Sequence, residues 1–419
     1  QGLAAFVMNG NTTAVSKKKR MRRTATSTNG GGGSASDAVR EIIDQSCRKI
    51  GYGAGIAVLS KSEDGADATP SQMEQPISKS SPAAAHSAVS PLMHCCFRAS
   101  WIHTRIAADF GVALLEKERR YADALDLIQV LLGRPEHPTK RGHLWNRFAI
   151  DLEHRGLTES SLEVAETALA DEWVRGGHRL ALQRRVLRLG KPPRRWKKPA
   201  FAERATWKPK EETIVGRPIH SKKSCKSRFV GFDDQDVSVE QLAIQHYEQQ
   251  GWNGVHTENG IWHTLFGLLM WDIIFSDAPD AFNHAFQSAP VDFDTDYFYA
   301  RRKELIEDRL SCVSDSAENA CSLLETVWTR EAPKRTLCTG VSWERYTLEE
   351  LNEVVYCVGG RGLAVILRLL AEDHRNWRSG MPDLFLWRSD PRPRALFAEV
   401  KGPRDQLADH QRAWLAELA

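Results

Sequence analysis

The stretch GMPDLFLWRSDPRPRALFAEVKGPRDQLADHQRAWLAEL, from Gly380 to Leu418, decides the fold of this 419-residue chain. Turn-forming residues around Ser389 and Pro391 separate its apolar runs, so it predicts two adjacent strands joined by a turn. The first strand opens at Asp383, the second covers residues 395–400, and a helix follows. Apolar residues on both strands indicate a buried sheet.

Three charged residues of this stretch suit metal-dependent chemistry. Glu399 and Lys401 are two residues apart, so both side chains leave the same face of the second strand. Asp383, at the mouth of the neighbouring strand, can join them. Carboxylates supply the hard oxygen ligands that Mg²⁺ or Mn²⁺ prefers, and a lysine can steady the attacking water or the negative charge that develops on a phosphodiester. The alternative is a solvated hairpin with a surface ion pair.

A second stretch, GWNGVHTENGIWHTLFGLLMWDIIF from Gly251 to Phe275, predicts a helix that is buried on nearly all sides. Its apolar residues nearly encircle the helix, namely Ile261, Leu265, Leu268, Leu269 and Ile273. Glu258 stands at or just before the first turn. This carboxylate has two explanations: it coordinates a cation shared with Asp383 and Glu399, or it interacts with the positive end of the helix dipole.

The formal net charge of +3 conceals a strong asymmetry along the chain. Residues 175–228 contain 18 Lys and Arg against 3 Asp and Glu, whereas residues 231–353 contain 8 against 23. This separation predicts one surface that attracts a polyanion and another region that concentrates carboxylates. A metal-dependent enzyme acting on nucleic acid needs both, although a solvated basic face is the alternative.

The cysteines and the N-terminal charges bear on the compartment. The eight cysteines show no C-x-x-C pair, which indicates reduced thiols in an intracellular protein. We find neither an apolar run of transmembrane length nor a signal-peptide core at the start. The basic cluster from Lys17 to Arg23 resembles a nuclear address, so we expect a nuclear protein.

The chain divides into three regions by composition. Residues 1–90 are rich in Ser, Ala, Gly, Thr and Pro and predict a disordered tail. Residues 91–230 show helical periodicity with small and large residues in alternation, typical of a tetratricopeptide-like array that ends in a basic segment. Residues 231–419 carry the predicted strands. The expected fold class is a mostly helical α/β chain with a small mixed sheet in its last region.

The basic segment, residues 189–230, alternates Arg and Lys with three aromatic residues, Trp196, Phe201 and Trp207. This combination suits phosphate contact together with stacking on unpaired bases. A plain linker is the alternative.

The last region resembles the PD-(D/E)xK nuclease core, and within it the VRR-NUC type, through Pro382-Asp383 and Glu399-Val400-Lys401. Over residues 101–418 the chain looks like the Fanconi-associated nuclease family. The motifs that carry this resemblance are WVRGGHRLALQRRVLRLGKPPRRW, GVHTENG with TLFGLLMWDIIF, and GMPDLFLW with FAEVKGPRDQL. The resemblance implies a tetratricopeptide-like region leading into a VRR-NUC nuclease domain.

The resemblance also implies roles for individual residues. The metal ligands would be the carboxylates of Glu258, Asp383 and Glu399 with the backbone carbonyl of Val400, and Lys401 would be the catalytic lysine. A basic pocket for the 5′ phosphate of DNA would use Arg141, His143, Arg147, His178, Arg375 and His410. The chain departs from the family at two of these positions, because an Arg is typical in place of His143 and a Lys in place of His410. A neutral imidazole holds phosphate less tightly than a guanidinium.

The family continues beyond the point that corresponds to Ala419 into at least one more strand. A missing strand would leave an open sheet edge, so we expect a nuclease domain that lacks its last strand.

The activity implied is that of a structure-specific DNA nuclease of interstrand-crosslink repair. It would cut 5′ flaps and remove short pieces 5′ to 3′ as a phosphodiesterase, with Mg²⁺ or Mn²⁺. Its partners would be branched DNA with a 5′ flap or 5′ phosphate end and crosslink-repair proteins, with neither a membrane nor a nucleotide cofactor. One alternative is an inert scaffold for DNA junctions or proteins, and another is a Holliday-junction resolvase.

Overall fold

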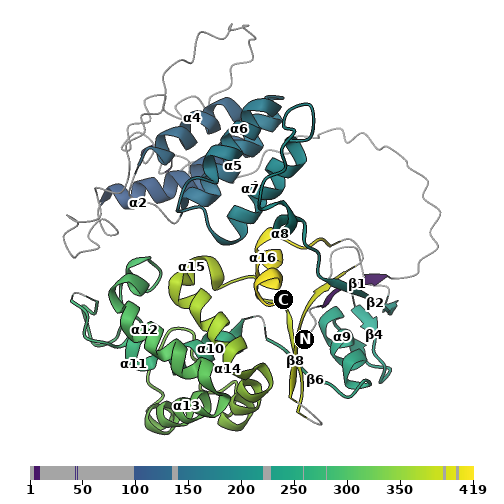
Figure 1. Cartoon of the computed structure of the whole chain (residues 1–419), viewed down its shortest axis with the longest axis vertical. Coiled ribbons are helices and arrows are strands. Elements are labelled where there is room, and N and C mark those ends of the chain that lie inside the picture. Colours follow the sequence, from purple (N-terminus) through teal and green to yellow (C-terminus); the bar gives the residue numbers. More distant parts are fainter. Residues whose placement is uncertain are drawn as a thin grey trace, which may run out of the picture. The chain divides into compact units, whose positions relative to one another are not determined.

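The structure is a computed structural model that describes residues 4–9, 43, 45, 99–134, 140–219, 228–257, 259–279, 281–389, 393–402 and 405–419. The chain forms two compact units. The smaller is Thr24–Val164, and the larger combines Gln1–Arg23 with Ala165–Ala419. Figure 1 labels the elements of both units along the chain.

The smaller unit consists of helices whose contacts combine small and large residues. Its elements are α2 (Ala99–Ile106), a π-helical turn (Ala107–Gly111), α3 (Val112–Lys117), α4 (Tyr121–Leu132), α5 (Arg141–His154) and the start of α6 (Thr158–Ala168). Leu115, Ala124, Ile128 and Leu144 share one buried cluster. Short packed helices with such a core are what the periodicity of this region predicted.

The larger unit is built on a five-stranded sheet with the order β2-β1-β8-β7-β6. The strands are β1 (Ala4–Asn9), β2 (Lys210–Val215), β6 (Asn253–His256), β7 (Leu384–Arg388) and β8 (Arg394–Lys401). β6, β7 and β8 are antiparallel neighbours, whereas β1 runs parallel to both β8 and β2. The predicted small mixed sheet is therefore present, and the two predicted strands are β7 and β8.

β1 departs from the predicted disordered tail at residues 4–9, while most of residues 1–90 lies outside the described residues. Ala4–Asn9 is a strand of this sheet, and its apolar sequence AAFVMN suits pairing between two other strands. Ile43, from the same tail, is buried in the core of the smaller unit. β1 also pairs with β8, from Ala4 opposite Ala398 to Val7 opposite Lys401, so β8 is not an edge strand.

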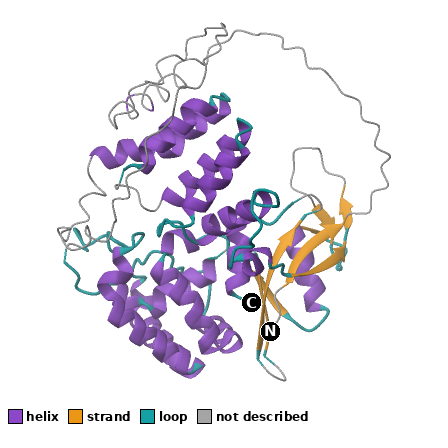
Figure 2. Ribbon diagram, turned by 45° about the horizontal axis from the view of Figure 1, so that its top comes forward, coloured by secondary structure: helices purple, strands orange, loops and turns teal. Residues whose placement is uncertain are grey.

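The two faces of the sheet pack against different helices, as Figures 1 and 2 show. On one face, Leu384, Leu386, Ala398 and Val400 share a cluster with α9 (Val239–Glu248). On the other face, residues that alternate with them, Phe385 and Phe397 among them, join the main helical core. This alternation places Asp383, Glu399 and Lys401 on the face of the main core.

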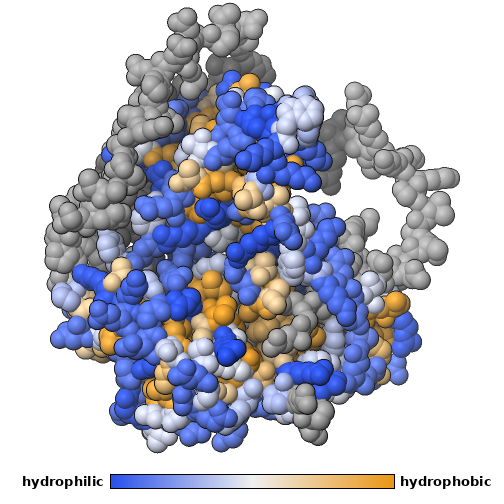
Figure 3. Space-filling view, viewed as in Figure 1, coloured by the Kyte–Doolittle hydropathy of each residue, from blue (hydrophilic) through white to orange (hydrophobic). Residues whose placement is uncertain are grey.

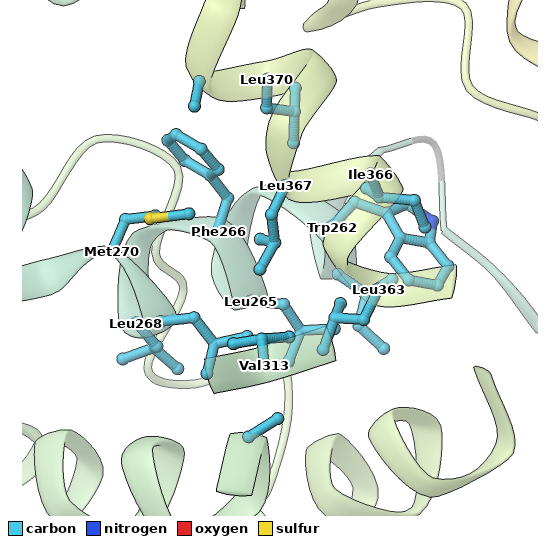
Figure 4. Packing of buried hydrophobic residues seen from close by; sticks show 14 of the residues in the cluster. Trp262, Leu265, Phe266, Leu268, Met270, Val313, Leu363, Ile366, Leu367 and Leu370 are labelled. Carbon is cyan, nitrogen blue, oxygen red and sulfur yellow. The ribbon is translucent and has the colours of Figure 1, made fainter. Parts of the chain in front are cut away.

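The helices of the main core are α10 (Gly260–Leu269), α11 (Trp271–Ile274), α12 (Tyr297–Asp315), α13 (Ala317–Glu331), α14 (Leu348–Glu372), α15 (His374–Trp377) and α16 (Asp409–Glu417). The residues that predicted a buried helix after Gly251 are all buried in α10 and α11. Figure 4 shows Leu265 and Phe266 of α10 among side chains of α14 such as Leu363 and Leu367. This packing fixes the helical layer that covers Asp383, Glu399 and Lys401, which we call the charged row.

The remaining elements of the larger unit are α7 (Gly176–Leu189), α8 (Ala202–Thr206), a three-stranded antiparallel sheet of β3 (Arg217–Ile219), β4 (Arg228–Val230) and β5 (Asp236–Val237), and a 3₁₀ turn (Ala332–Lys334). These elements place the boundary between units differently from the predicted one at residues 230 and 231. β2 precedes that boundary yet lies in the same sheet as β8. The basic segment therefore folds with the larger unit, because strand pairing binds it there.

α14 is long and apolar enough, by length and composition, to cross a membrane, whereas the sequence was expected to contain no run of that length. Its residues Leu351, Val354, Leu363, Ile366 and Leu370 are buried in the main core, as those of a core helix are. On the face shown in Figure 3, hydrophilic side chains cover most of the described surface and hydrophobic ones gather only in small areas. The packing of α14 thus accounts for its composition.

Candidate active site

The register of β7 and β8 brings two acids face to face. Leu384 pairs with Ala398 in this antiparallel ladder, so the preceding position of β7, Asp383, lies opposite Glu399. Side chains directly opposite each other share a face and lie about 5 Å apart at Cβ. The sequence predicted this meeting from the period of a strand and the turn that joins the two strands.

Glu399 is held by two side chains that bind the same oxygen. Lys401 Nζ lies 2.5 Å and Gln411 Nε2 2.6 Å from Glu399 Oε1. The backbone N–H of Val400 donates to Asp383 Oδ2 at 3.1 Å. The two carboxylates are thus fixed by donors from β8 and α16, and Lys401 stands within the row as an oriented cation.

The second oxygen of Glu399 has no such partner. Glu399 is 0% exposed, and among the described residues nothing forms a hydrogen bond with its Oε2. Burial, and then the neighbouring charge of Asp383, raises the pKa of Glu399 to about 8. A buried carboxylate oxygen without a donor, beside a second acid, is the chemistry that a divalent cation satisfies.

Thr257 extends the row by one strand. Its backbone N–H donates to the carbonyl of Asp383 at 3.0 Å, one position beyond the pair of His256 with Leu384. Val255, two residues earlier, packs against the main core, so Thr257 shares the face of Asp383 and Glu399. Its hydroxyl is buried, and no hydrogen-bond partner for it occurs within the described parts of the chain.

The third predicted ligand, Glu258, lies outside the described residues. Those residues contain no group of three or more His, Cys, Asp and Glu side chains that could hold a metal ion. On either side of position 258 the chain is tied to the start of β7: Thr257 bonds to Asp383, and Asn259 Oδ1 accepts from the Met381 N–H at 3.0 Å. The structure therefore brings together Asp383, Glu399, Val400 and Lys401 of the predicted set.

α16 is clamped beside this row. Trp414 Nε1 donates to the carbonyls of Trp377 and Ser379, at 3.2 and 3.1 Å. Gly177 and Gly380 allow close approach, because a Cβ on either would lie within 3 Å of atoms of His410. This packing fixes Gln411 against Glu399.

Three of the residues predicted to bind a 5′ phosphate lie on elements of the larger unit that meet. His178 is on α7, Arg375 on α15 and His410 on α16, and α7 packs against both of the other helices. Burial lowers the pKa of His410, and the charge of Lys401 adds to this effect. A neutral His410 offers hydrogen bonding but no charge for a phosphate.

The other three predicted phosphate ligands lie on α5 of the smaller unit. Arg141 Nη1 donates to the Leu132 carbonyl at 2.6 Å, and Arg147 Nε donates to Glu116 Oε1 at 2.6 Å. Burial lowers the pKa of His143, with the charges of Lys140 and Arg147 as further causes. Within this unit the two arginines are thus held by acceptors of neighbouring helices.

Sequence reasoning did not single out Thr257. The signal was present, because Val255 and Thr257 are two residues apart on a strand and Glu258 follows directly. This spacing places Thr257 at the site only if β6 pairs with β7, and local periodicity does not predict that pairing.

The antiparallel hairpin with its opposed acids, the adjacent lysine and the covering helix all lie within residues 319–419, which the family model of the VRR-NUC nuclease domain matches. The model described as "Fanconi-associated nuclease 1, TPR domain" matches residues 61–190. The chain belongs to the Fanconi-associated nuclease family, which confirms the resemblance and the expected fold class.

Individual relatives agree. A Fanconi-associated nuclease 1 homolog of Oryza sativa subsp. japonica is 48% identical over 327 residues, which are 77% of this chain and 33% of the relative. Human Fanconi-associated nuclease 1 is 38% identical over 344 residues, 78% of this chain and 34% of the relative. The chain thus spans about a third of the length of these relatives.

A solved structure also matches. It is described as "paFAN1 bound to 2nt 5'flap DNA with gap", and it aligns with a TM-score of 0.59 at 26% identity, covering 76% of this chain and 53% of that one.

Proposed function

We propose that this chain is a structure-specific DNA nuclease that hydrolyses phosphodiesters at 5′ flaps and degrades DNA 5′ to 3′ in interstrand-crosslink repair. The observation that carries the proposal is the row of Asp383, Glu399 and Lys401, in which Glu399 is buried and one of its carboxylate oxygens lacks a partner among the described residues. Membership of the family and the likeness to a protein solved with 5′ flap DNA support the substrate.

The donor set fits a hard divalent cation, Mg²⁺ or Mn²⁺. Asp383 and Glu399 would hold it, together with Glu258 and the carbonyl of Val400. Such an ion lowers the pKa of a bound water and offsets charge on a phosphate oxygen. Such an ion would also offset the repulsion between the buried Glu399 and the half-buried Asp383.

The protein's own groups position the reaction. The Lys401 ammonium, held 2.5 Å from Glu399, would orient the attacking water or stabilise the charge that develops on the phosphate. Gln411 keeps Glu399 in place through its 2.6 Å hydrogen bond. His178, Arg375 and His410 would locate the 5′ end, with Arg141, His143 and Arg147 contributing from the helical unit.

The test is Asp383→Ala in a cleavage assay with Mn²⁺ and a 5′-flap duplex. We expect cleavage to be lost while DNA affinity stays within about threefold, because the substitution removes a ligand and not a phosphate contact. Asp234→Ala is the matched control, since Asp234 is an exposed acid paired with Arg217. Cleavage by Asp383→Ala at the parent rate would refute the assignment.

The same assay decides between the nuclease and the inert scaffold. An open sheet edge was one reason to expect inactivity, and β8, which pairs with β1, is not an edge strand. A parent chain that binds the flap but leaves it uncut in Mn²⁺ would identify a scaffold. Paired symmetric nicks on a four-way junction would identify a resolvase.

Nuclear import and recruitment by crosslink-repair proteins complete the proposal. The basic cluster from Lys17 to Arg23 lies outside the described residues, so its support is its composition. Replacing its lysines and arginines by serine in a fluorescently tagged chain should shift the chain out of the nucleus. An unchanged distribution would refute the address.

A further inference from the structure

A cavity of about 210 Å³ lies between α7, α8 and α16 in the larger unit. Its wall combines arginines and a lysine with apolar and aromatic residues. The lining residues are Leu180, Arg184, Leu187, Arg204, Trp207, Lys208 and Arg412, with Ala205, Thr206 and Ala416 completing it. A single water needs only roughly 10–15 Å³, so the cavity is large enough for part of a ligand.

The positive charge of the cavity is only partly balanced. Arg184 is paired with Asp409 and Arg204 with Glu417. Lys208 is exposed at the cavity. Four cationic groups thus face three acids, Asp409, Glu417 and Glu211, and this excess of positive charge favours an anion as the occupant.

Arg412 is the cationic residue of the cavity whose charge is least well accommodated by the protein. Its Nε is buried, and no acceptor for it occurs among the residues that the structure describes. Burial lowers the pKa of Arg412, and the charge of Arg184 lowers it further. The Arg412 side chain lines the cavity and is crowded by a second cation, so an anionic oxygen in the cavity would stabilise its charge.

Trp207 supplies a surface of another kind. Its side chain is 36% exposed and lines the cavity beside Lys208, while Leu180 and Leu187 form apolar wall. Indole faces stack on nucleobases irrespective of sequence. A base that stacks here must lie outside the duplex, because neighbouring base pairs cover both faces of a base within it.

The cavity gathers residues that are far apart in the sequence. Arg204, Trp207 and Lys208 belong to the basic segment that the sequence singled out for phosphate contact and stacking. α7 and α16 contribute Arg184 and Arg412, which are distinct from the residues predicted for the 5′ phosphate on the same helices, His178 and His410. The cavity is therefore a separate site.

We propose that this cavity binds one nucleotide of a single DNA strand, with its phosphate on Arg412 and Lys208 and its base against Trp207. The proposal rests on the proposed function in that it takes DNA as the ligand. The cavity would hold an unpaired nucleotide of a branched DNA, while the charged row cleaves the same DNA at another position.

The test measures fluorescence anisotropy of a labelled single-stranded 15-mer and of the matching blunt duplex. The parent chain is used in EDTA, so binding is read without cleavage. Lys208→Gln should weaken single-strand binding by a few-fold and reduce the slope of log affinity against log salt by about 0.7, as loss of one phosphate contact does. Arg412→Gln should weaken it more, by about tenfold, because its contact is buried.

Trp207 separates stacking from charge. Trp207→Ala should weaken single-strand binding at least about fivefold, whereas Trp207→Phe keeps a stacking face and should stay within about twofold of the parent. The control for loss of one positive charge is Arg335→Gln. Arg335 is an exposed arginine paired with Glu344, as Arg204 is with Glu417, but it does not line the cavity. Its affinity should equal that of the parent.

Two results would overturn the proposal. One is unchanged single-strand affinity in Lys208→Gln, Trp207→Ala and Arg412→Gln, with circular dichroism showing that the variants fold. The other is an equal loss of duplex affinity, which would make the cavity a general DNA contact. Cleavage of the 5′ flap by the parent in Mn²⁺ is measured separately, so failure of the nuclease proposal is distinguishable from failure of this site.

Discussion

Glu399 in the sheet and Asp151 in the helical unit are both acids with 0% exposure and a raised pKa. Burial is the main cause in each case, and a neighbouring acid is the next, Asp383 for Glu399 and Glu116 for Asp151. The pKa reaches about 8 for Glu399 and about 7 for Asp151. By these criteria alone the two sites look alike.

They differ in what surrounds the carboxylate. Two donors hold Glu399 Oε1 within 2.6 Å, whereas neither oxygen of Asp151 has a hydrogen-bond partner in the described part of the chain. The cation beside Asp151, Arg147, is 3.9 Å away and bonds instead to Glu116 at 2.6 Å. Glu399 thus has two fixed donors on one oxygen and a second oxygen left for a cation, whereas Asp151 has no donor that would stabilise its charge. A raised pKa does not by itself identify a metal site.

The largest expected effect separates the two cations beside these acids. Lys401→Gln should lower the single-turnover rate of flap cleavage by about 10²–10⁴, the range for loss of a positioned proton-transfer or charge-stabilising group. Arg147→Gln should leave that rate, at saturating enzyme, within about threefold, because its role would be in binding. An equal fall of the cleavage rate in both variants would contradict the different roles given to Lys401 and Arg147.

The charged row could be predicted because a strand has a period of two residues. Glu399, Lys401 and Asp383 follow from that period and from one hairpin turn, which are local features. α10 could also be predicted, since apolar residues on all sides of a helix leave burial as the only outcome. Both predictions needed no knowledge of distant pairing.

The features that were missed depend on pairing between distant segments. β1 and β2 pair with each other, and β1 with β8, yet β2 reads KEETIV, with charged residues that resemble a linker. Thr257 joins the site only through the register of β6 with β7. Arg184 and Arg412 meet the basic segment only because α7 packs on α16. Composition carries no information about such contacts.

The next largest effect is on the pH dependence of the unfolding free energy, which reports whether Asp151 is protonated in the folded chain. A folded-state pKa near 7, raised from 3.8, means that the folded state holds a proton more tightly than the unfolded state. The unfolding free energy therefore falls as pH rises from about 4 to about 7. Asp151→Asn removes this loss and should stabilise the unit at pH 8 by roughly 2–4 kcal/mol, and at pH 5 by less than about half of that.

Urea unfolding at pH 5 and pH 8, followed by circular dichroism, measures this difference between variant and parent. Asp126→Asn is the control, since the pKa of Asp126 is also raised, by burial and then Asp123, but its side chain is exposed. Its gain should be much smaller. Equal gains at both pH values for Asp151→Asn would show that its charge is not the cause.

A third effect concerns the cation that only the sheet site should bind. Mn²⁺ at a hundredfold excess over its dissociation constant should stabilise the parent by about 2.7 kcal/mol. Glu399→Gln should lose most of this gain, and Asp151→Asn should retain it. Thermal unfolding with and without Mn²⁺, and with EDTA added back, provides the measurement. Equal stabilisation of Glu399→Gln and the parent would place the ion elsewhere.

The smallest expected effect uses two buried threonines on neighbouring elements. Thr257 has a buried hydroxyl with no partner among the described residues, whereas Thr264 Oγ1 donates to the Gly340 carbonyl at 3.2 Å and accepts from the Ser342 N–H at 3.3 Å. Without metal, Thr257→Val should stabilise the chain by about 1 kcal/mol and Thr264→Val should destabilise it by about 1–2 kcal/mol.

The sign of the Thr257 effect should depend on the ion. If its hydroxyl bonds to a water held beside Asp383 and Glu399, that bond exists only when the site is filled. The gain from Thr257→Val should then shrink or reverse in Mn²⁺, while the loss from Thr264→Val stays constant, because its two partners belong to the protein backbone. A Thr257→Val gain that is the same with Mn²⁺ and with EDTA would exclude the hydroxyl from the metal site.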